Sequence, residues 1–311
     1  MISQSGQGIL PWLSVQFLGT TTIFVGLQTS ADKIYIIRPT AEDDDFVEFR
    51  DRNDRVWKVE RGILRPCLLD VHFSDFCSAS PNAYMIFPYK VGKKADIYSV
   101  EEMETQFPKT LEYLSSFKEN LKARNLSKLT ADNWFQFGRS QSLIKFNGEP
   151  KLVWSVLMKR GEPRYVYDDN NVVFTGGGNG PYYGLRIRPD SSLSLFYIQA
   201  VLHHPVIDAM VAGSTFQGGY ISHGKQFVEE LPIKDIDFND AEEKGIYDNL
   251  IRVTRLLNDL ARKAQTATTP QKKEFHTRRM GMLKREMFVL VERLYGLGQD
   301  DLELVQGINE Q

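Results

Sequence analysis

Short runs of β-branched and aromatic residues, separated by glycine, proline and asparagine, occupy the first 240 residues of the chain. Such runs predict strands, and helical patterns interrupt them. Ser99 and Glu102 form a capping box, Pro108 opens a second helix, and residues 191–204 have the apolar spacing of a third. The pattern therefore predicts an α+β fold, with a mixed, β-rich domain over residues 1–240. The predicted strands are Thr21–Leu27, Lys33–Ile37, Phe46–Phe49, Val56–Val59, Tyr84–Phe87, Lys151–Met158, Val172–Phe174 and Tyr182–Ile187.

Beyond residue 240 the apolar residues follow the spacing of two long helices. Ile246–Leu260 and Gln271–Leu294 are joined by the short segment TATTP, and the second pattern stops at YGLG. Each pattern carries an apolar seam of the kind that pairs antiparallel helices. We therefore expect a helical hairpin over residues 241–311. Its seams either pack on the α+β body or dock a partner, and the sequence leaves both readings open.

The segment VVFTGGGNGPYYGLRIR (residues 172–188) contains a glycine loop, residues 175–181. Phe174 and the glycines at 176, 178 and 180 fit the F-x-G-x-G-x-G pattern with which many methyltransferases bind S-adenosylmethionine (AdoMet). Such a loop needs a helix after it, because the free N–H groups of the helix hold the ligand. Here the following residues alternate as in a strand, and no N-P-P-Y tetrapeptide for a flipped adenine occurs. We therefore expect no AdoMet site, and glycines that bring backbone N–H groups to an anion such as phosphate.

Composition narrows the class of protein without identifying it. At 311 residues and 42% hydrophobic content the chain can bury a substantial core. It has neither an apolar run of about 20 residues nor a secretory signal pattern, so we expect a cytoplasmic protein with no membrane segment. Cys67 and Cys77 are spaced for neither a zinc knuckle nor a redox pair, and the histidines form no ligand pattern. No metal site is expected.

Charge is unevenly distributed along the chain, although its net value is −2. Residues 84–188 carry about five more basic than acidic side chains, whereas 40–60 and 229–249 are acid-rich. We expect one positive face suited to a polyanion, with ordinary solvated charge as the alternative. Asp132 with Glu149 and Lys151 imitates a nuclease motif, but Pro150 interrupts the strand that such a motif needs.

Several segments, in this order, resemble the TaqI-like C-terminal specificity domain. That domain is the target-recognition part of adenine-specific DNA methyltransferases and of type IIG restriction–modification enzymes. The resemblance covers most of the chain. Two departures stand out: VLHHP replaces an Asn-Ser helix ending, and the AdoMet-binding domain that precedes this region in the family is expected to belong to a partner or to a longer parent protein. The segments include VGLQTSADKIYII (25–37), VERGILRPCL (59–68), WFQFGRSQSL (134–143), KLVWSVL (151–157), the glycine loop, FQGGYISHGKQFVEELPI (216–233) and REMFVLVERLYGLGQDDLELV (285–305).

The resemblance implies a specificity domain or subunit that is not catalytic by itself. It would bind double-stranded DNA and position an adenine methyltransferase, and in some relatives a nuclease, on the target. No cofactor is expected in this chain, because AdoMet would bind the catalytic partner, which the hairpin would dock. Two alternatives stay open: an excised methyltransferase fragment that helps hold the flipped adenine, and a protein-interaction regulator that uses the acid-rich stretches.

The residues expected to contact DNA are cationic, small polar, glycine or tyrosine residues on loops and strands, suited to phosphates or base edges. Arg186 and Arg188 alternate with aliphatic residues, so both are expected on one ligand-facing side of a strand. For each residue a local turn, packing or solvated charge is the alternative. The full set is Arg139, Ser140, Gln141, Lys145, Lys159, Arg160, Arg164, Gly177, Gly178, Asn179, Tyr182, Tyr183, Arg186, Arg188, Gly219, Tyr220 and Lys225.

Overall fold

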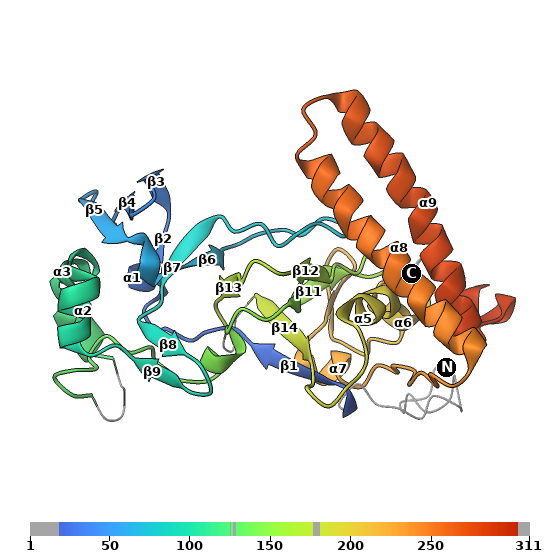
Figure 1. Cartoon of the computed structure of the whole chain (residues 1–311), viewed down its shortest axis with the longest axis horizontal. Coiled ribbons are helices and arrows are strands. Elements are labelled where there is room, and N and C mark those ends of the chain that lie inside the picture. The colour runs from blue at the N-terminus through green and yellow to red at the C-terminus, as the bar shows by residue number, and fades with distance from the viewer. Residues whose placement is uncertain (1–18, 125, 127–128, 177–180, 304–311) are drawn as a thin grey trace.

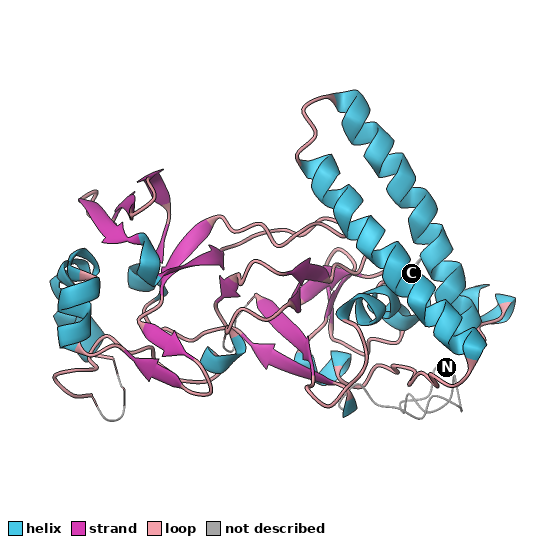
Figure 2. Ribbon diagram, in the orientation of Figure 1, coloured by secondary structure: helices cyan, strands magenta, loops and turns pink. Residues whose placement is uncertain are grey.

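The computed structural model describes residues 19–303, apart from 125, 127–128 and 177–180. Within these residues the fold is mixed α+β, as predicted, with several small sheets and a pair of long C-terminal helices. Figure 1 shows an elongated body with the helix pair rising from one end, and Figure 2 shows that the strands lie in the body.

A four-stranded antiparallel sheet lies between two hydrophobic clusters. Neighbouring residues on its strands point into different clusters: Phe24 and Val153 into the first, Ile23 and Leu152 into the second. The sheet is therefore buried on both faces, which fits its largely apolar strands. Its order is β1 (Thr21–Val25), β14 (Tyr182–Ile187), β10 (Lys151–Ser155) and β12 (Val166–Asp168).

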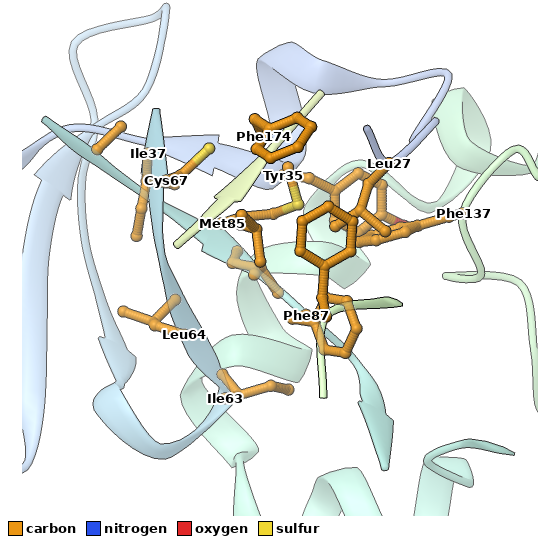
Figure 3. Close-up of a cluster of buried hydrophobic side chains, with 14 of the residues drawn as sticks. Leu27, Tyr35, Ile37, Ile63, Leu64, Cys67, Met85, Phe87, Phe137 and Phe174 are labelled. Carbon is orange, nitrogen blue, oxygen red and sulfur yellow. The ribbon is translucent and has the colours of Figure 1, made fainter. Parts of the chain in front are cut away.

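The first cluster fills the end of the body away from the helix pair. Leu27, Met85, Phe87, Phe137 and Phe174 are buried in it, and Figure 3 shows their side chains converging. The sheets around it are β13 (Val173–Phe174), β6 (Leu64–Leu68), β7 (Ala83–Ile86) and β2 (Ile36–Ile37); β3 (Pro39–Glu42), β4 (Phe46–Arg50) and β5 (Val56–Glu60); and β8 (Tyr89–Val91) with β9 (Ala95–Ile97). Its helices are α1 (Asp32–Tyr35), α2 (Val100–Gln106), α3 (Pro108–Ser116) and α4 (Lys118–Lys122).

The second cluster joins the rest of the body to the base of the hairpin. Leu185, Tyr197, Leu257 and Met287 are all buried in it. It is enclosed by β11 (Leu157–Lys159), β16 (Tyr220–Ser222) and β15 (Thr215–Phe216), and by α5 (Leu195–Leu202), α6 (Pro205–Ala209) and α7 (Lys225–Val228). Short 3-10 turns occupy Arg61–Ile63 and Leu143–Lys145.

The C-terminal hairpin consists of α8 (Ala241–Gln265) and α9 (Pro270–Tyr295), which confirms the two predicted helices. Asp240 caps the first turn of α8 through the N–H groups of Glu242 and Glu243, and Gly296 ends α9 with a φ of 62°. Buried residues occur in α8 up to Ala261 and in α9 from Met287 onward. The base of the hairpin therefore packs on the body. The boundary at residue 240 stays a prediction.

Two predicted strands differ from the structure. Residues 33–37 begin as helix α1, because the N–H groups of Ile34 and Tyr35 both donate to the Ala31 carbonyl, and only Ile36–Ile37 is a strand. Residues 151–158 divide into β10 and β11 at Val156, whose N–H donates to Pro181 and whose carbonyl accepts from His223. These contacts direct the two halves into separate sheets.

Asp75 ties the loop between β6 and β7 to the hairpin. Its carboxylate accepts a 2.6 Å hydrogen bond from Lys284 and lies 3.8 Å from the Arg164 guanidinium. On the same side the imidazole of His203 is 3.7 Å away, stacked at 4.2 Å on Phe76. The long loop, the end of α5 and α9 thus share one polar cluster, in which His203 is buried and the other side chains are half-buried.

We expect acid to destabilise this junction. Burial lowers the pKa of His203 to about 4, and burial lowers that of His204 to about 4 as well. Unfolded histidines titrate near 6.5, so the unfolded chain binds more protons between these values and stability falls as pH drops from about 6.5 to 4. Urea unfolding at several pH values should show a flatter dependence for His203→Asn. The exposed His72→Gln is the control, and equal slopes for the two variants would contradict the assignment.

Candidate nucleic-acid interface

An open cleft of about 900 Å³ lies beside the first hydrophobic cluster. Its walls come from the segment after β1, the loop between β4 and β5, helix α4 with the Phe117 that precedes it, and the two described ends of the glycine loop. The polar and cationic residues that line it include Gln28, Lys33, Arg52, Asn53, Asn120 and Arg139. Segments far apart in the sequence thus present hydrogen-bonding groups to one concave surface.

A close backbone crossing brings Arg139 and the glycine loop together. On one side of the segment after β1, the Leu27 N–H donates to Phe174 and the Gly176 N–H donates to Leu27. On the other side the Arg139 N–H donates to the Gln28 carbonyl at 3.1 Å. The segment is therefore clamped between the two regions, and both face the cleft.

Gly26 and Gly176 make this crossing possible. A Cβ on Gly26 would lie 2.3 Å from the Thr175 carbonyl carbon, and a Cβ on Gly176 would lie 2.3 Å from the Gly26 nitrogen. At least one glycine of the sequence motif thus serves chain packing. The Gly177, Gly178 and Asn179 of the predicted set lie outside the described residues.

Gly26→Ala is expected to destabilise the protein by about 1–3 kcal/mol, because a well-packed backbone must separate to admit a methyl group. Gly245→Ala, in helix α8, is the matched control: no atom lies within 4 Å of its added Cβ, so helix propensity should make it neutral or stabilising. Chemical unfolding of the two variants measures the difference. Equal midpoints would show that the crossing tolerates a side chain.

Arg139 lines the cleft, and Ser140 and Gln141 follow it in the chain. Arg139 and Ser140 are exposed and Gln141 is half-buried. Within the described residues the Arg139 guanidinium has no hydrogen bond or ion pair, and neither has the half-buried ammonium of Lys145. Their charges are therefore available to a ligand.

The loop between β4 and β5 was missed by sequence reasoning, which took this stretch only as acid-rich. Asp51 holds it: one carboxylate oxygen accepts from the N–H groups of Asn53 and Arg55, and the other accepts from the Trp57 indole at 2.9 Å. The loop is thereby fixed with the exposed Arg52 and Asn53 at the cleft. The signal in the sequence is a polar turn between the predicted strands Phe46–Phe49 and Val56–Val59.

A second cluster of predicted residues lies on the sheet β11–β16–β15. Lys159 pairs across the strands with Tyr220, and Tyr220 with Phe216, so the three side chains share one face. Tyr220 is 44% and Phe216 48% exposed. Gly219 has a φ of 76° in the turn, and its carbonyl accepts from the Arg160 N–H. We call this face the aromatic platform; Phe216 was not predicted.

Some predicted cations already have acidic partners. Lys159 lies 3.2 Å from Glu162, Arg164 lies 3.0 Å from the same glutamate, and Lys225 lies 3.6 Å from Glu229. Arg188, exposed beyond β14, is 3.3 Å from Asp190. Arg160 has no acidic partner within the described residues. The pairs of Lys159 and Arg188 are exposed and weak, so a phosphate could displace their carboxylates, whereas Arg164 is half-buried and also lies near Asp75.

The expectation for Arg186 is wrong. It was placed on a ligand-facing side, yet it is only 6% exposed, and its guanidinium donates to the Glu149 side chain and carbonyl, each at 3.1 Å. The physical reason is that β14 is a central strand covered on both faces. Glu149, which belongs to the nuclease-like motif of the sequence, thus serves as the ion-pair partner of Arg186.

The two tyrosines after the glycine loop both pack against other residues of the protein, and Tyr182 is buried. Tyr182 is 2% exposed, and its hydroxyl donates to the Val71 carbonyl and accepts from the Val71 N–H. Its predicted contact with a ligand is therefore corrected to a packing role. Tyr183 is half-buried and stacks on Trp154 with a centroid distance of 5.8 Å.

The local structure does not fit an AdoMet loop. Phe174 is fully buried in the first cluster, the backbone at Gly176 is occupied by the crossing with Gly26, and β14 follows the loop as a strand, as predicted. The described residues on either side of the loop therefore offer no helix N-terminus to a nucleotide. Among the described residues no group of three or more His, Cys, Asp or Glu side chains is placed to hold a metal ion. No helix in that part of the chain is long and apolar enough to cross a membrane.

The chain is similar to one region of restriction–modification enzymes. It is 27% identical over 299 residues to the Type II restriction enzyme and methyltransferase RM.Eco57I of Escherichia coli, and this match covers 92% of the chain and 30% of the relative. It thus spans about a third of that protein's length. No protein-family model matches the sequence.

A solved structure shares the fold. The Type IIL restriction–modification enzyme MmeI, determined in complex with DNA, superposes with a TM-score of 0.53 at 11% identity. The match covers 93% of this chain and 35% of MmeI. At this identity the similarity shows a common fold alone.

Proposed function

We propose that this chain is the DNA target-recognition region of a restriction–modification enzyme, of the TaqI-like, type IIG kind. In this role it positions an AdoMet-dependent adenine methyltransferase on duplex DNA. The observation that carries the proposal is the cleft, where Arg139, Arg52 and Asn53 meet the ends of the glycine loop. Arginine and asparagine are the side chains that most often read guanine and adenine edges.

The cleft and the aromatic platform make different kinds of contact with DNA in this proposal. In the cleft, Arg139, Arg52 and Asn53 read bases, since none of these side chains is engaged within the described residues. On the aromatic platform, Lys159 and Arg160 hold phosphates while Tyr220 packs against sugar or base. Phosphate contacts fix the position of the duplex and base contacts specify its sequence.

The proposal leaves methyl transfer to another domain or subunit. Its support is the glycine loop, whose described ends serve chain packing and are followed by a strand. Residues 1–240 would recognise DNA, and residues 241–311 would form the hairpin that docks the catalytic partner. A nuclease in the same assembly is compatible with this arrangement, because the relative is both a restriction enzyme and a methyltransferase.

Two titrations test this division of labour. The chain should bind a fluorescent duplex pool with an affinity that falls as salt rises, because phosphate contacts release counterions. Calorimetry with AdoMet should show no binding. Stoichiometric AdoMet binding would contradict a non-catalytic role, and absence of duplex binding at low salt would contradict recognition.

A further inference from the structure

Positive charge is concentrated in one projecting part of the molecule. Residues 262–285, which we call the hairpin arm, contain eight Lys and Arg residues and one acidic residue, Glu274. Since the whole chain has 38 basic and 40 acidic residues, the rest of it holds 30 and 39. The arm thus carries a net charge of +7 on a protein whose remainder carries −9.

Most of these cations have no acidic partner among the described residues. Arg262, Arg278 and Lys284 lie within 4 Å of Asp169, Glu274 and Asp75 respectively. The other five are exposed and form no ion pair with any described residue; they are Lys263, Lys272, Lys273, Arg279 and Arg285. Like charges held close together repel, so the arrangement carries an electrostatic cost that an anionic ligand would remove.

The hairpin arm is an extended surface formed by elements other than those that line the cleft. In Figure 1 its joining loop forms the free end of the helix pair, farthest from the base that packs on the body. The part of α9 within it, residues 270–285, is about 24 Å long at 1.5 Å per residue. It contains no fully buried side chain, so packing does not explain its composition.

We propose that the hairpin arm binds the phosphate backbone of duplex DNA outside the recognised sequence, without reading bases. This inference rests on the proposed function for the presence of DNA. A span of about 24 Å matches roughly seven base pairs at 3.4 Å per pair, a length that offers phosphates to the four unpaired cations on α9. The arm lengthens the contact with DNA and raises affinity for any flanking sequence.

An acidic helix docked on α9 is the rival occupant, because Phe275 and Met282 are 60% and 64% exposed and lie seven residues apart on one side. Such a helix would use only the cations beside that line. Lys263 belongs to the other helix, and Lys273 lies about 160° around α9 from Phe275. Electrostatic attraction acts over about 8 Å at physiological salt, and duplex DNA is wider than a single helix. DNA therefore attracts the cations on both helices and on several sides of α9.

The test compares two variants of the full chain from which the same number of charges is removed. The arm variant is Lys272→Gln, Lys273→Gln, Arg279→Gln and Arg285→Gln, and the control is Lys93→Gln, Lys94→Gln, Lys109→Gln and Lys118→Gln. Seven of the eight positions are exposed and Lys118 is half-buried, and glutamine keeps the helix propensity of Lys and Arg. Both proteins are titrated with random-sequence duplex pools of about 15 and 45 base pairs over a range of salt.

We expect the arm variant to bind the long pool about 10- to 100-fold more weakly at low salt, with a salt slope reduced by about 2 to 4, since each phosphate contact contributes about 0.9. The loss should be smaller for the short pool. Equal binding by the arm and control variants would overturn the inference, and would leave the arm to an acidic protein. If the wild type selects no sequence from a random library but the arm variant still binds the long pool more weakly than the control, the proposed function fails. The inference that the arm binds phosphates then remains supported.

Discussion

Asp168→Ala is expected to lower the free energy of unfolding by about 3–5 kcal/mol, because it leaves a buried charge without a partner. Asp168 and Lys151 form an ion pair in which both side chains are completely buried. Burial lowers the pKa of Lys151, and the carboxylate opposes that effect. Without Asp168 the ammonium must either stay charged in an apolar setting or lose its proton, and both cost free energy.

Asp168 also shapes the approach to the glycine loop. Its two oxygens accept from the N–H groups of Asn170 and Val172 at 3.0 and 3.1 Å, which fixes the turn from β12 to β13. Urea unfolding at neutral pH measures the loss. Asp169→Ala is the control, because Asp169 is exposed and lies 3.8 Å from Arg262, so its removal should cost less than about 1 kcal/mol.

A double variant separates loss of the pair from loss of the turn. Lys151→Met with Asp168→Leu removes both charges and should recover the part of the stability lost to the unpaired ammonium, because apolar replacements of buried ion pairs are often neutral. The loss that remains measures the two hydrogen bonds that hold the turn. A loss below 1 kcal/mol for Asp168→Ala alone would contradict the expected cost of an isolated buried ammonium.

Arg139→Ala is expected to weaken binding to the preferred duplex by about 1–3 kcal/mol, or roughly 5- to 150-fold, if its guanidinium reads a base. Its backbone is fixed by the hydrogen bond to Gln28, while its side chain is unengaged within the described residues. Truncation should therefore leave the fold intact. Equal unfolding midpoints for variant and wild type would confirm that the loss belongs to binding.

The salt dependence distinguishes the two kinds of contact that Arg139 could make. A phosphate contact would weaken binding to all duplexes alike and reduce the salt slope by about 0.9. A base contact would relax preference at one position of the target. Lys94→Ala, which removes an exposed charge from the turn between β8 and β9, is the control. Unchanged affinity and unchanged slope for Arg139→Ala would contradict its place in the interface.

Local sequence patterns predicted the elements whose structure depends on neighbouring residues. The capping box at Ser99 is formed, β14 has the predicted bounds Tyr182–Ile187, and the hairpin has both of its helices. In each case the signal is periodicity or a cap within a few residues. Such signals survive in any tertiary setting that buries the apolar face.

The misplaced side chains depend on contacts that the chain makes at long range. Alternation along β14 suggested one solvent-facing side, but the strand is central and both faces are covered, so Arg186 is buried against Glu149 from 37 residues away. Likewise Arg52 and Asn53 reach the cleft only because β4 and β5 fold beside the first cluster. A single sequence gives no measure of such contacts.

Selection of bound duplexes from a random library, performed with the full chain at two salt concentrations, tests sequence recognition most directly. Nonspecific attraction weakens steeply with salt, whereas base contacts retain their discrimination. We expect one sequence family to be enriched, and its enrichment to persist or sharpen at the higher salt. Binding without enrichment, or enrichment that disappears with added salt, would contradict the assignment of this chain as a target-recognition region.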